Sequence, residues 1–174
     1  VSRLNRLIVD VREISTIDSQ IEPLDGVILR PTTVIEPLIS SFKLKNRGIT
    51  FKIVEHCDMT ILISPIKFSR VIENIVSNAV SFSPLESTIE ITIDRDGGNL
   101  IIEIGDEGPG IAKENIDKIF NRFFTYRDHN ANRNSGLGLS ISLAIINVYG
   151  GNIRVYNKAD VGVCFRIELP IMRI

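Results

Sequence analysis

The stretch STIEITIDRDGGNLIIEIGDEG, residues 87–108, decides the fold. Apolar and polar residues alternate on both sides of the turn at residues 96–98, which is the pattern of a two-stranded hairpin with one buried face. Two further runs of strand character close the chain, NIRVYN at 152–157 and GVCFRIELP at 162–170. The second half of the chain is therefore predicted to form a largely antiparallel sheet.

A helix is predicted immediately before the hairpin. Ser64 is placed to cap it, and Pro65 suits its first position. Apolar residues then recur at helical spacing without a slip, at Phe68, Val71, Ile72, Ile75, Val76 and Ala79. We expect this apolar stripe to pack on the sheet.

Shorter patterns predict the elements that precede this helix. VILRP at 27–31 is a strand candidate, and a helix capped by Thr32 or Thr33 is expected to end at Gly48. The β-branched runs ITFKIV and MTILI flank the polar turn EHCD and are expected to pair with each other.

After the hairpin, a loop is expected from residue 107 to residue 135, and a last helix from about 138 to 149. With the closing strands, these elements predict an α/β protein. Its fold class is a two-layer α/β sandwich, in which three helices cover one face of a mixed, largely antiparallel sheet.

Composition limits the classes of partner. The chain has 20 Lys and Arg against 21 Asp and Glu, so no overall field attracts nucleic acid or anionic lipid. Cys57 and Cys164 lack metal-site spacing and are expected to be reduced thiols. No apolar run approaches the ~20 residues of a membrane span, and the start without Met is compatible with a piece of a longer membrane protein.

The first residues have a separate character. In residues 1–20, Leu4, Leu7, Val11 and Ile14 lie three and four residues apart, as in a helix of a coiled coil or bundle. A plain amphipathic helix lying on the domain has the same periodicity. The stretch IEPLDG that follows has the composition of a hinge.

Two asparagines interrupt the helix before the hairpin. Asn78 lies at the edge of its apolar stripe and Asn74 lies about 40° further out, on the flank that also carries Lys67 and Ser81. Such amides usually hydrogen-bond to neighbouring backbone. Two aligned amide oxygens can instead hold a hard cation, such as the magnesium carried by a nucleotide.

Two glycine clusters favour a nucleotide. In GDEGPGI, residues 105–111, Asp106 follows a strand and can accept from the exocyclic amine of adenine, whereas a plain turn with a solvated Asp is the alternative. In NSGLGLSIS, residues 134–142, Gly136 and Gly138 free backbone N–H groups at a helix start, where phosphate is favoured.

A basic stretch lies between the glycine clusters. Arg122, Arg127 and Arg133 occur within residues 121–135, among small polar residues. One interpretation is a flexible loop that closes over phosphates, and the other is a solvated surface loop.

These motifs resemble those of the catalytic ATP-binding domain of sensor histidine kinases, a family related to gyrase and to chaperone and mismatch-repair ATPases. ENIVSNAVSFSP resembles its N box, DEGPGI its first glycine box, IFNRFF its phenylalanine box and SGLGLSIS its second glycine box. The likeness covers about residues 30 to 170. RLNRLIVDVREISTIDSQ together with NAVSFSP further resembles ChvG-type alphaproteobacterial sensor kinases.

The resemblance implies ATP and magnesium as cofactors. Asn78 would bind the magnesium with support from Asn74, Asp106 would take the adenine amino group, and Arg127 would act with the asparagines in catalysis. The residues expected to contact the nucleotide are Asn74, Asn78, Phe82, Asp106, Gly108, Gly110, Ile111, Tyr126, Arg127, Gly136, Leu137, Gly138 and Leu139.

Two positions depart from the family pattern. The family often has Lys where Ser81 stands and an extra Gly where Asn134 stands. Arg127 or Arg133 can supply the phosphate contact that the Lys would make. Without the extra Gly, the loop expected to close over the phosphates should be somewhat stiffer than in the family.

The resemblance also bears on the reaction. Relatives that hydrolyse ATP place a glutamate base where Asn74 stands, so transfer to another nucleophile is favoured here. The family's nucleophile is a histidine on a helix, and neither His56 nor His129 fits that motif.

The expected phosphoacceptor therefore lies outside the chain. Residues 1–22 are expected to end a dimerization helix and linker, and residues 23–174 to form the catalytic domain. The implied partners are a dimerization and phosphoacceptor domain, a response regulator and a second copy in the full protein, with no nucleic acid. The implied location is the cytoplasmic part of an inner-membrane sensor. A non-catalytic nucleotide-binding module, an anti-sigma serine kinase and a gyrase-like hydrolase are the alternatives.

Overall fold

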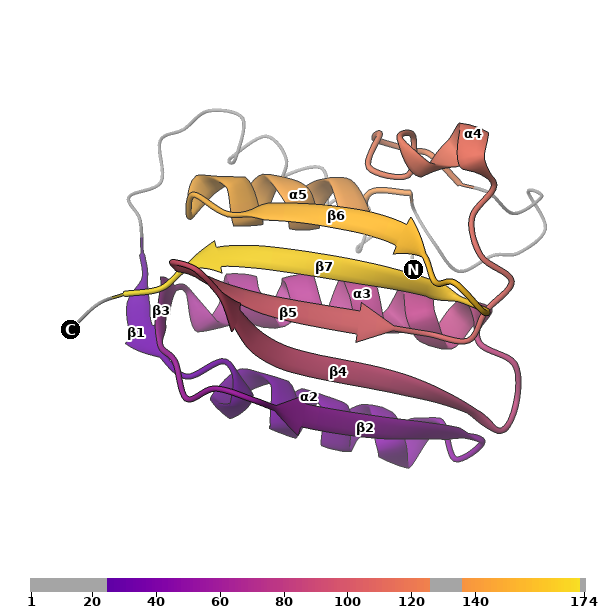
Figure 1. Ribbon diagram of the computed structural model, residues 1–174, viewed down its shortest axis with the longest axis horizontal. Helices are drawn as coiled ribbons and strands as arrows, with labels where there is room; N and C mark the ends of the chain where they lie inside the picture. The colour runs from indigo at the N-terminus through magenta and orange to yellow at the C-terminus, as the bar shows by residue number, and fades with distance from the viewer. Residues whose placement is uncertain (1–24, 126–135, 173–174) are drawn as a thin grey trace, which may run out of the picture.

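The computed structural model describes residues 25–125 and 136–172 (Figure 1). The helix expected over residues 1–20 lies outside the described residues. The elements in chain order are β1 (Val27–Leu29), α2 (Thr32–Lys45), β2 (Ile49–Glu55), β3 (Ile61–Ile63), α3 (Pro65–Phe82), β4 (Ser87–Asp96), β5 (Asn99–Gly105), α4 (Lys113–Ile116), α5 (Gly138–Val148), β6 (Asn152–Asn157) and β7 (Val163–Pro170).

Five strands form the main sheet, in the order β2-β4-β5-β7-β6. β2 runs parallel to β4, and the other neighbouring pairs are antiparallel. The predicted hairpin is confirmed, because Asp96 pairs with Asn99 and Gly97 takes a φ of 58°, as a tight hairpin turn requires. The predicted mixed, largely antiparallel sheet is confirmed with it.

Helices α2, α3 and α5 cover one face of this sheet, and among the described residues no helix covers the other face, called here the open face (Figure 1). The predicted apolar stripe of α3 is buried at every one of its positions. It packs in one core with inward-facing strand residues such as Ile89, Ile91 and Ile93. Each fully buried Ile contributes about 1.5–3 kcal/mol of transfer free energy, so this alternation fixes which face of the hairpin meets the helices.

The predicted pairing of the two runs around EHCD is wrong. β3 pairs antiparallel with β1 in a separate two-stranded sheet, and β2 pairs with β4. The backbone N–H of His56 still donates to the carbonyl of Ile93 in β4, at 2.8 Å, so the polar segment extends β2 rather than turning it back. β-branched composition predicts a strand but not its partner, and here α3 serves as the crossover that a parallel pair needs.

Two predicted helix ends and one predicted loop also need correction. α2 begins at Thr32 with Pro31 before it, so neither Thr32 nor Thr33 is its cap, and it ends at Lys45 rather than Gly48. Ser64 is the N-cap residue of α3, as predicted, although its side chain makes no capping hydrogen bond. The loop expected after residue 107 contains the one-turn helix α4.

Tyr149 ties α3 and α5 together at the end of the molecule away from the glycine clusters. Its hydroxyl accepts from the backbone N–H of Ser64 at 3.2 Å and donates to Asp25 Oδ1 at 3.1 Å. Lys67 Nζ lies 2.9 Å from the same carboxylate oxygen. Lys67, on the flank that carries the asparagines, therefore pairs with the segment that enters the domain.

Candidate nucleotide site

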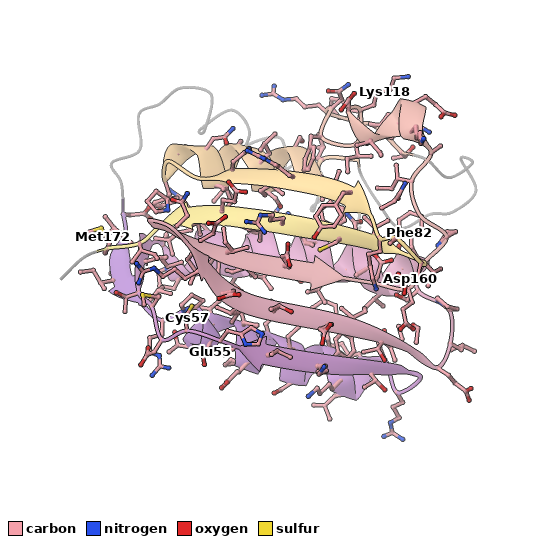
Figure 2. All side chains as sticks on the ribbon, viewed as in Figure 1. Glu55, Cys57, Phe82, Lys118, Asp160 and Met172 are labelled. Atoms are coloured by element: carbon pink, nitrogen blue, oxygen red, sulfur yellow. The ribbon has the colours of Figure 1, made fainter. Side chains whose placement is uncertain are left out.

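The three motif-bearing segments meet at one end of the sandwich. The end of α3, the end of β5 and the start of α5 lie toward the right of Figure 1, and Figure 2 shows Phe82 toward the same end. A Cβ added to Gly108 would lie 2.9 Å from the Phe82 carbonyl oxygen, and one added to Gly138 would lie 3.3 Å from Asn74 Oδ1. The last half of α3 thus touches both glycine clusters.

Asp106 is the buried charged residue of this region. It directly follows β5, and only 3% of its surface is exposed. Its Oδ1 accepts from the backbone N–H groups of Gly108, at 2.8 Å, and Val163, at 3.2 Å. Because both bonds end on Oδ1, the second carboxylate oxygen is left to accept from a ligand amine.

Burial also sets the charge behaviour of Asp106. Desolvation raises the pKa of this carboxyl above its ordinary value of 3.8, against the two backbone hydrogen bonds and the charge of Lys158, which lower it. Lys158 Nζ also donates to the Asp106 carbonyl oxygen, at 3.2 Å. A carboxylate with so little exposed surface is a strong acceptor.

Glycine is required where the backbone closes around Asp106. Gly162, between β6 and β7, has a φ of +96°, and a Cβ there would overlap the Asp106 carbonyl oxygen. Gly110 has a φ of +84° and turns the loop back toward Asn157. Ile111 then pairs with Asn157, whose Oδ1 accepts from the Ile111 N–H at 2.8 Å and whose Nδ2 donates to the Ile111 carbonyl at 2.7 Å.

The two asparagines of α3 have different surroundings. Asn74 Nδ2 donates to the Gly138 carbonyl at 2.9 Å and to Ser142 Oγ at 3.1 Å, and Ser142 itself donates to the Gly138 carbonyl. For Asn74, the ordinary explanation of a bond to neighbouring backbone therefore holds. Asn78 lies one turn further along α3 and is half-buried.

The residues just before α5 are fixed by burial and by a backbone hydrogen bond. Leu137, just before its first residue, is fully buried. Gly136 has a φ of +70°, and its carbonyl accepts from the N–H of Phe123 at 2.9 Å. Gly138 and Leu139 form the first turn of this 11-residue helix, so their N–H groups lie at its positive end.

Several expected residues lie outside the described part of the chain. Tyr126 and Arg127 are among them, as are Arg133 and Asn134. Within residues 25–125 and 136–172, no group of three or more His, Cys, Asp or Glu residues is arranged to hold a metal ion.

Reasoning from the sequence missed the contribution of the connection between β6 and β7. Asn157, Lys158 and Gly162 all contact the glycine loop or its aspartate. A glycine in a hairpin connection was the one signal available for them. The pairs 157–111 and 158–106 join residues far apart in the chain, which no local pattern reveals.

A separate hollow of about 170 Å³ lies on the open face of the sheet. Arg166 lines it and pairs there with Glu103 at 3.1 Å and Asp96 at 3.2 Å. None of the residues that line the hollow belongs to the three segments of the nucleotide site. Its lining is mostly charged or polar, with Ile101 as the apolar member.

Within the described ranges, no helix combines the length and the apolar character needed to cross a bilayer. The family model for "Histidine kinase-, DNA gyrase B-, and HSP90-like ATPase" matches residues 63–173. That range contains the three segments that meet at the site.

Among similar proteins, the sensor protein ChvG of Agrobacterium fabrum is 34% identical over 98% of this chain and 31% of its own length. Histidine kinase P4 of Formosa agariphila is 33% identical over 98% of this chain and 13% of its own. The chain thus spans less than a third of either relative. The predicted resemblance to ChvG-type sensor kinases is confirmed.

Solved structures agree. The mycobacterial sensor histidine kinase MprB superposes with a TM-score of 0.76 at 25% identity, covering 86% of this chain and 99% of its own. Histidine kinase ThkA, solved in complex with the response regulator TrrA, gives a TM-score of 0.78 at 28% identity, covering 98% of this chain and 49% of its own. The chain belongs to the histidine kinase-, DNA gyrase B- and HSP90-like ATPase family, in the form found in sensor histidine kinases.

Proposed function

We propose that this chain is the ATP-binding catalytic part of a two-component sensor kinase, which transfers the γ-phosphate of ATP to a histidine outside residues 1–174. The observation that carries the proposal is the meeting of α3, the Asp106 loop and the start of α5 at one end of the sheet. Membership of an ATPase family makes the chain a nucleotide-using domain. The role of each residue in binding or transfer is part of this proposal.

The adenine would lie against the loop that follows β5. Asp106 accepts from two backbone N–H groups through Oδ1, so its other oxygen is suited to the exocyclic amine of adenine. A Cβ at Gly108 would lie 2.9 Å from the Phe82 carbonyl oxygen, so a glycine lets the loop pack closely on the end of α3 beside the proposed adenine position. Gly110 and Ile111 would line the remaining edge of the base.

The phosphates would lie between α3 and the first turn of α5. The N–H groups of Gly138 and Leu139 favour negative charge there. By the family resemblance, Tyr126 and Arg127, which lie outside the described residues, would be among the contacts of the nucleotide. Magnesium is commonly bound by only one or two protein oxygens together with phosphates and waters. The half-buried amide of Asn78 on this flank fits that donor set, so Asn78 would hold a magnesium ion that neutralises the phosphate charge.

Transfer to histidine is favoured over hydrolysis by the state of Asn74. An amide cannot take a proton from water, and its N–H group is already donated to Gly138 and Ser142. Glu73, the neighbouring carboxylate, is exposed. In the transfer, an imidazole nitrogen attacks the γ-phosphorus. The bond from that phosphorus to the oxygen bridging the β- and γ-phosphates breaks, and ADP leaves.

The nucleophile would come from a partner domain. His56 directly follows β2 and is not on a helix, so it lacks the setting of a phosphoacceptor histidine. We infer that residues 1–22 end a dimerization helix and linker and that residues 23–174 form the catalytic domain. The full protein would be a homodimer in the inner membrane, with this part in the cytoplasm, and would pass phosphate to a response regulator.

The test is a transfer assay in trans. This chain, ATP and magnesium are mixed with a separately prepared dimerization domain that carries the histidine. Phosphohistidine should form and should disappear in Asn78→Ala, while Asn147→Ala, an exposed Asn late in α5, keeps transfer at the wild-type level. ATP binding without transfer under any pairing would identify a non-catalytic binding module, and no ATP binding would reject both functions.

A further inference from the structure

Asn157 makes an unusual contact for the last residue of a strand. Its side-chain amide both accepts from and donates to the peptide of Ile111, at 2.8 and 2.7 Å. The two bonds form a closed pair, in which an amide side chain takes the place that a neighbouring strand would take. Residue 111 is 46 positions away in sequence, so this contact ties the end of β6 to the far end of the glycine loop.

The glycine loop, residues 106–111, is anchored at its other end by Asp106. Oδ1 of that carboxylate holds the N–H of Gly108 at 2.8 Å, and Gly108 is confined by the Phe82 carbonyl. Between the two anchors, Gly110 has a φ of +84°, and a Cβ there would lie 3.2 Å from Asn157 Oδ1. Glycines give a free loop many conformations, and fixing both ends removes most of them.

The same connection between β6 and β7 also supports Asp106. Lys158 donates to its carbonyl, Val163 donates to its carboxylate, and Gly162 packs directly on its backbone. The β6–β7 hairpin therefore holds both the first and the last residue of the glycine loop. Asn157 is the member that reaches the last one.

We propose that Asn157 is a positioning residue, which holds the glycine loop in the conformation that receives adenine and so contributes to the affinity and selectivity for ATP. This inference rests on the proposed nucleotide function. It assigns Asn157 no contact with ATP, because its amide is occupied by the Ile111 peptide. Its effect is to remove the ordering cost that a loose loop would add to binding.

Two variants separate the components of this contact. Asn157→Ala removes both hydrogen bonds. Asn157→Asp keeps an acceptor for the Ile111 N–H but sets a second carboxylate oxygen against the Ile111 carbonyl, so the donor is lost and repulsion is added. The matched control is Asn152→Ala at the opposite end of the same strand, where the side chain accepts only from the adjacent Ile153 N–H.

The first measurement needs no nucleotide. Amide hydrogen exchange of Ile111 in the full 174-residue chain should be faster in both Asn157 variants than in wild type and unchanged in Asn152→Ala. Unchanged exchange at Ile111 in Asn157→Ala would overturn the inference.

The second measurement compares ligands with and without the base, in the presence of magnesium. Asn157→Ala should bind ATP about five- to tenfold more weakly, as the loss of two solvent-accessible hydrogen bonds allows, and should bind tripolyphosphate within about twofold of wild type. Equal weakening for both ligands, or the same weakening in Asn152→Ala, would show a general structural effect and overturn it. Failure of wild type to bind ATP would reject the proposed function, and the exchange result would still report whether Asn157 holds the loop.

Discussion

The two ends of the proposed nucleotide site are built differently, and each is named here after the part of ATP proposed to bind there. The base end consists of backbone, glycines and one buried carboxylate, Asp106, whose Oδ1 and carbonyl oxygen are both in use. The phosphate end consists of half-buried side chains of α3 against the first turn of α5, joined by the contact of Asn74 with Gly138 and Ser142. The base end is held by backbone packing and bonds to backbone groups, whereas the phosphate end is held by hydrogen bonds of side chains.

The chemistry of the two ligand parts explains this difference. Adenine is flat and uncharged, so its recognition depends on a desolvated acceptor in a fixed position, where an unmatched polar group costs affinity. Triphosphate is highly charged and arrives with a cation and waters, so it is met by N–H groups and oxygen ligands at a wet surface. The comparison predicts that changes at the base end alter selectivity between ATP and tripolyphosphate, and that changes at the phosphate end affect both ligands alike.

The largest effect is expected at the base end, from Gly162→Ala. The new methyl group would overlap the Asp106 carbonyl oxygen, at a φ of +96° that L residues rarely adopt. Left-handed strain of about 1–2 kcal/mol and overpacking of about 1–3 kcal/mol together should lower the free energy of unfolding by about 2–5 kcal/mol. Urea denaturation measures the loss, and ATP binding should be lost with it.

Gly98→Ala is the control for this prediction. Gly98 lies in the turn between β4 and β5, where an added Cβ meets nothing within 4 Å and φ is not positive. Its unfolding free energy should stay within about 1 kcal/mol of wild type, or rise slightly as the unfolded chain loses freedom. A tolerated Gly162→Ala would mean that the base end is not rigid, and the comparison would fail.

The next effect is on affinity, from Asp106→Asn. The amide oxygen can keep both bonds from Gly108 and Val163, but its NH₂ group would then face the adenine amine, donor against donor. ATP binding should weaken by about 1–3 kcal/mol, measured by calorimetry, while tripolyphosphate binding stays unchanged. The fold should not be weakened, because the variant removes a buried charge, and an unchanged ATP affinity would contradict the adenine role.

A pH titration tests the same residue without a large structural change. Burial raises the pKa of Asp106 above 3.8, so this group favours the folded state below its unfolded pKa, and that contribution is lost as pH rises through the folded pKa. ATP affinity should move the other way and fall as pH drops through the raised pKa, because the acceptor becomes protonated. The terminal phosphate of ATP titrates in the same range, so the fall is measured relative to Asp106→Asn, from which the part due to residue 106 should be absent between neutral pH and about pH 4.

Much of the base end could be predicted from the sequence, because its signals are local. Alternation around residues 96–98 places Asp106 at a strand end, and the glycines that follow it indicate close approach of backbone. The contribution of Asn157 could not be predicted in this way. An Asn at the end of a strand is typical of the approach to a turn, and its partner Ile111 is reached only through the folded sheet.

At the phosphate end, helical periodicity placed Asn74 and Asn78 on one flank, but it carries no information on where an amide points. Asn74 turns to α5 because Gly138 lacks a side chain and Ser142 offers a buried hydroxyl there. The partner of β2 was missed for the same reason, since strand composition does not encode which strand lies alongside. Long-range pairing is decided by the whole core.

The smallest effect is expected at the phosphate end, from Ser142→Ala. Ser142 is fully buried, and its loss leaves the Asn74 amide with one acceptor, the Gly138 carbonyl, so the free energy of unfolding should fall by only about 1 kcal/mol. Ser140→Ala is the control, because Ser140 Oγ donates to the Leu137 carbonyl in its own turn. This variant should change the free energy of unfolding by about 0.5 kcal/mol or less.

Ser142→Ala also weakens the contact between the first turn of α5 and α3. The affinities for ATP and for tripolyphosphate should therefore fall by the same small factor. A loss confined to ATP would show that the first turn of α5 also orders the base end, and the two ends could no longer be treated as independent.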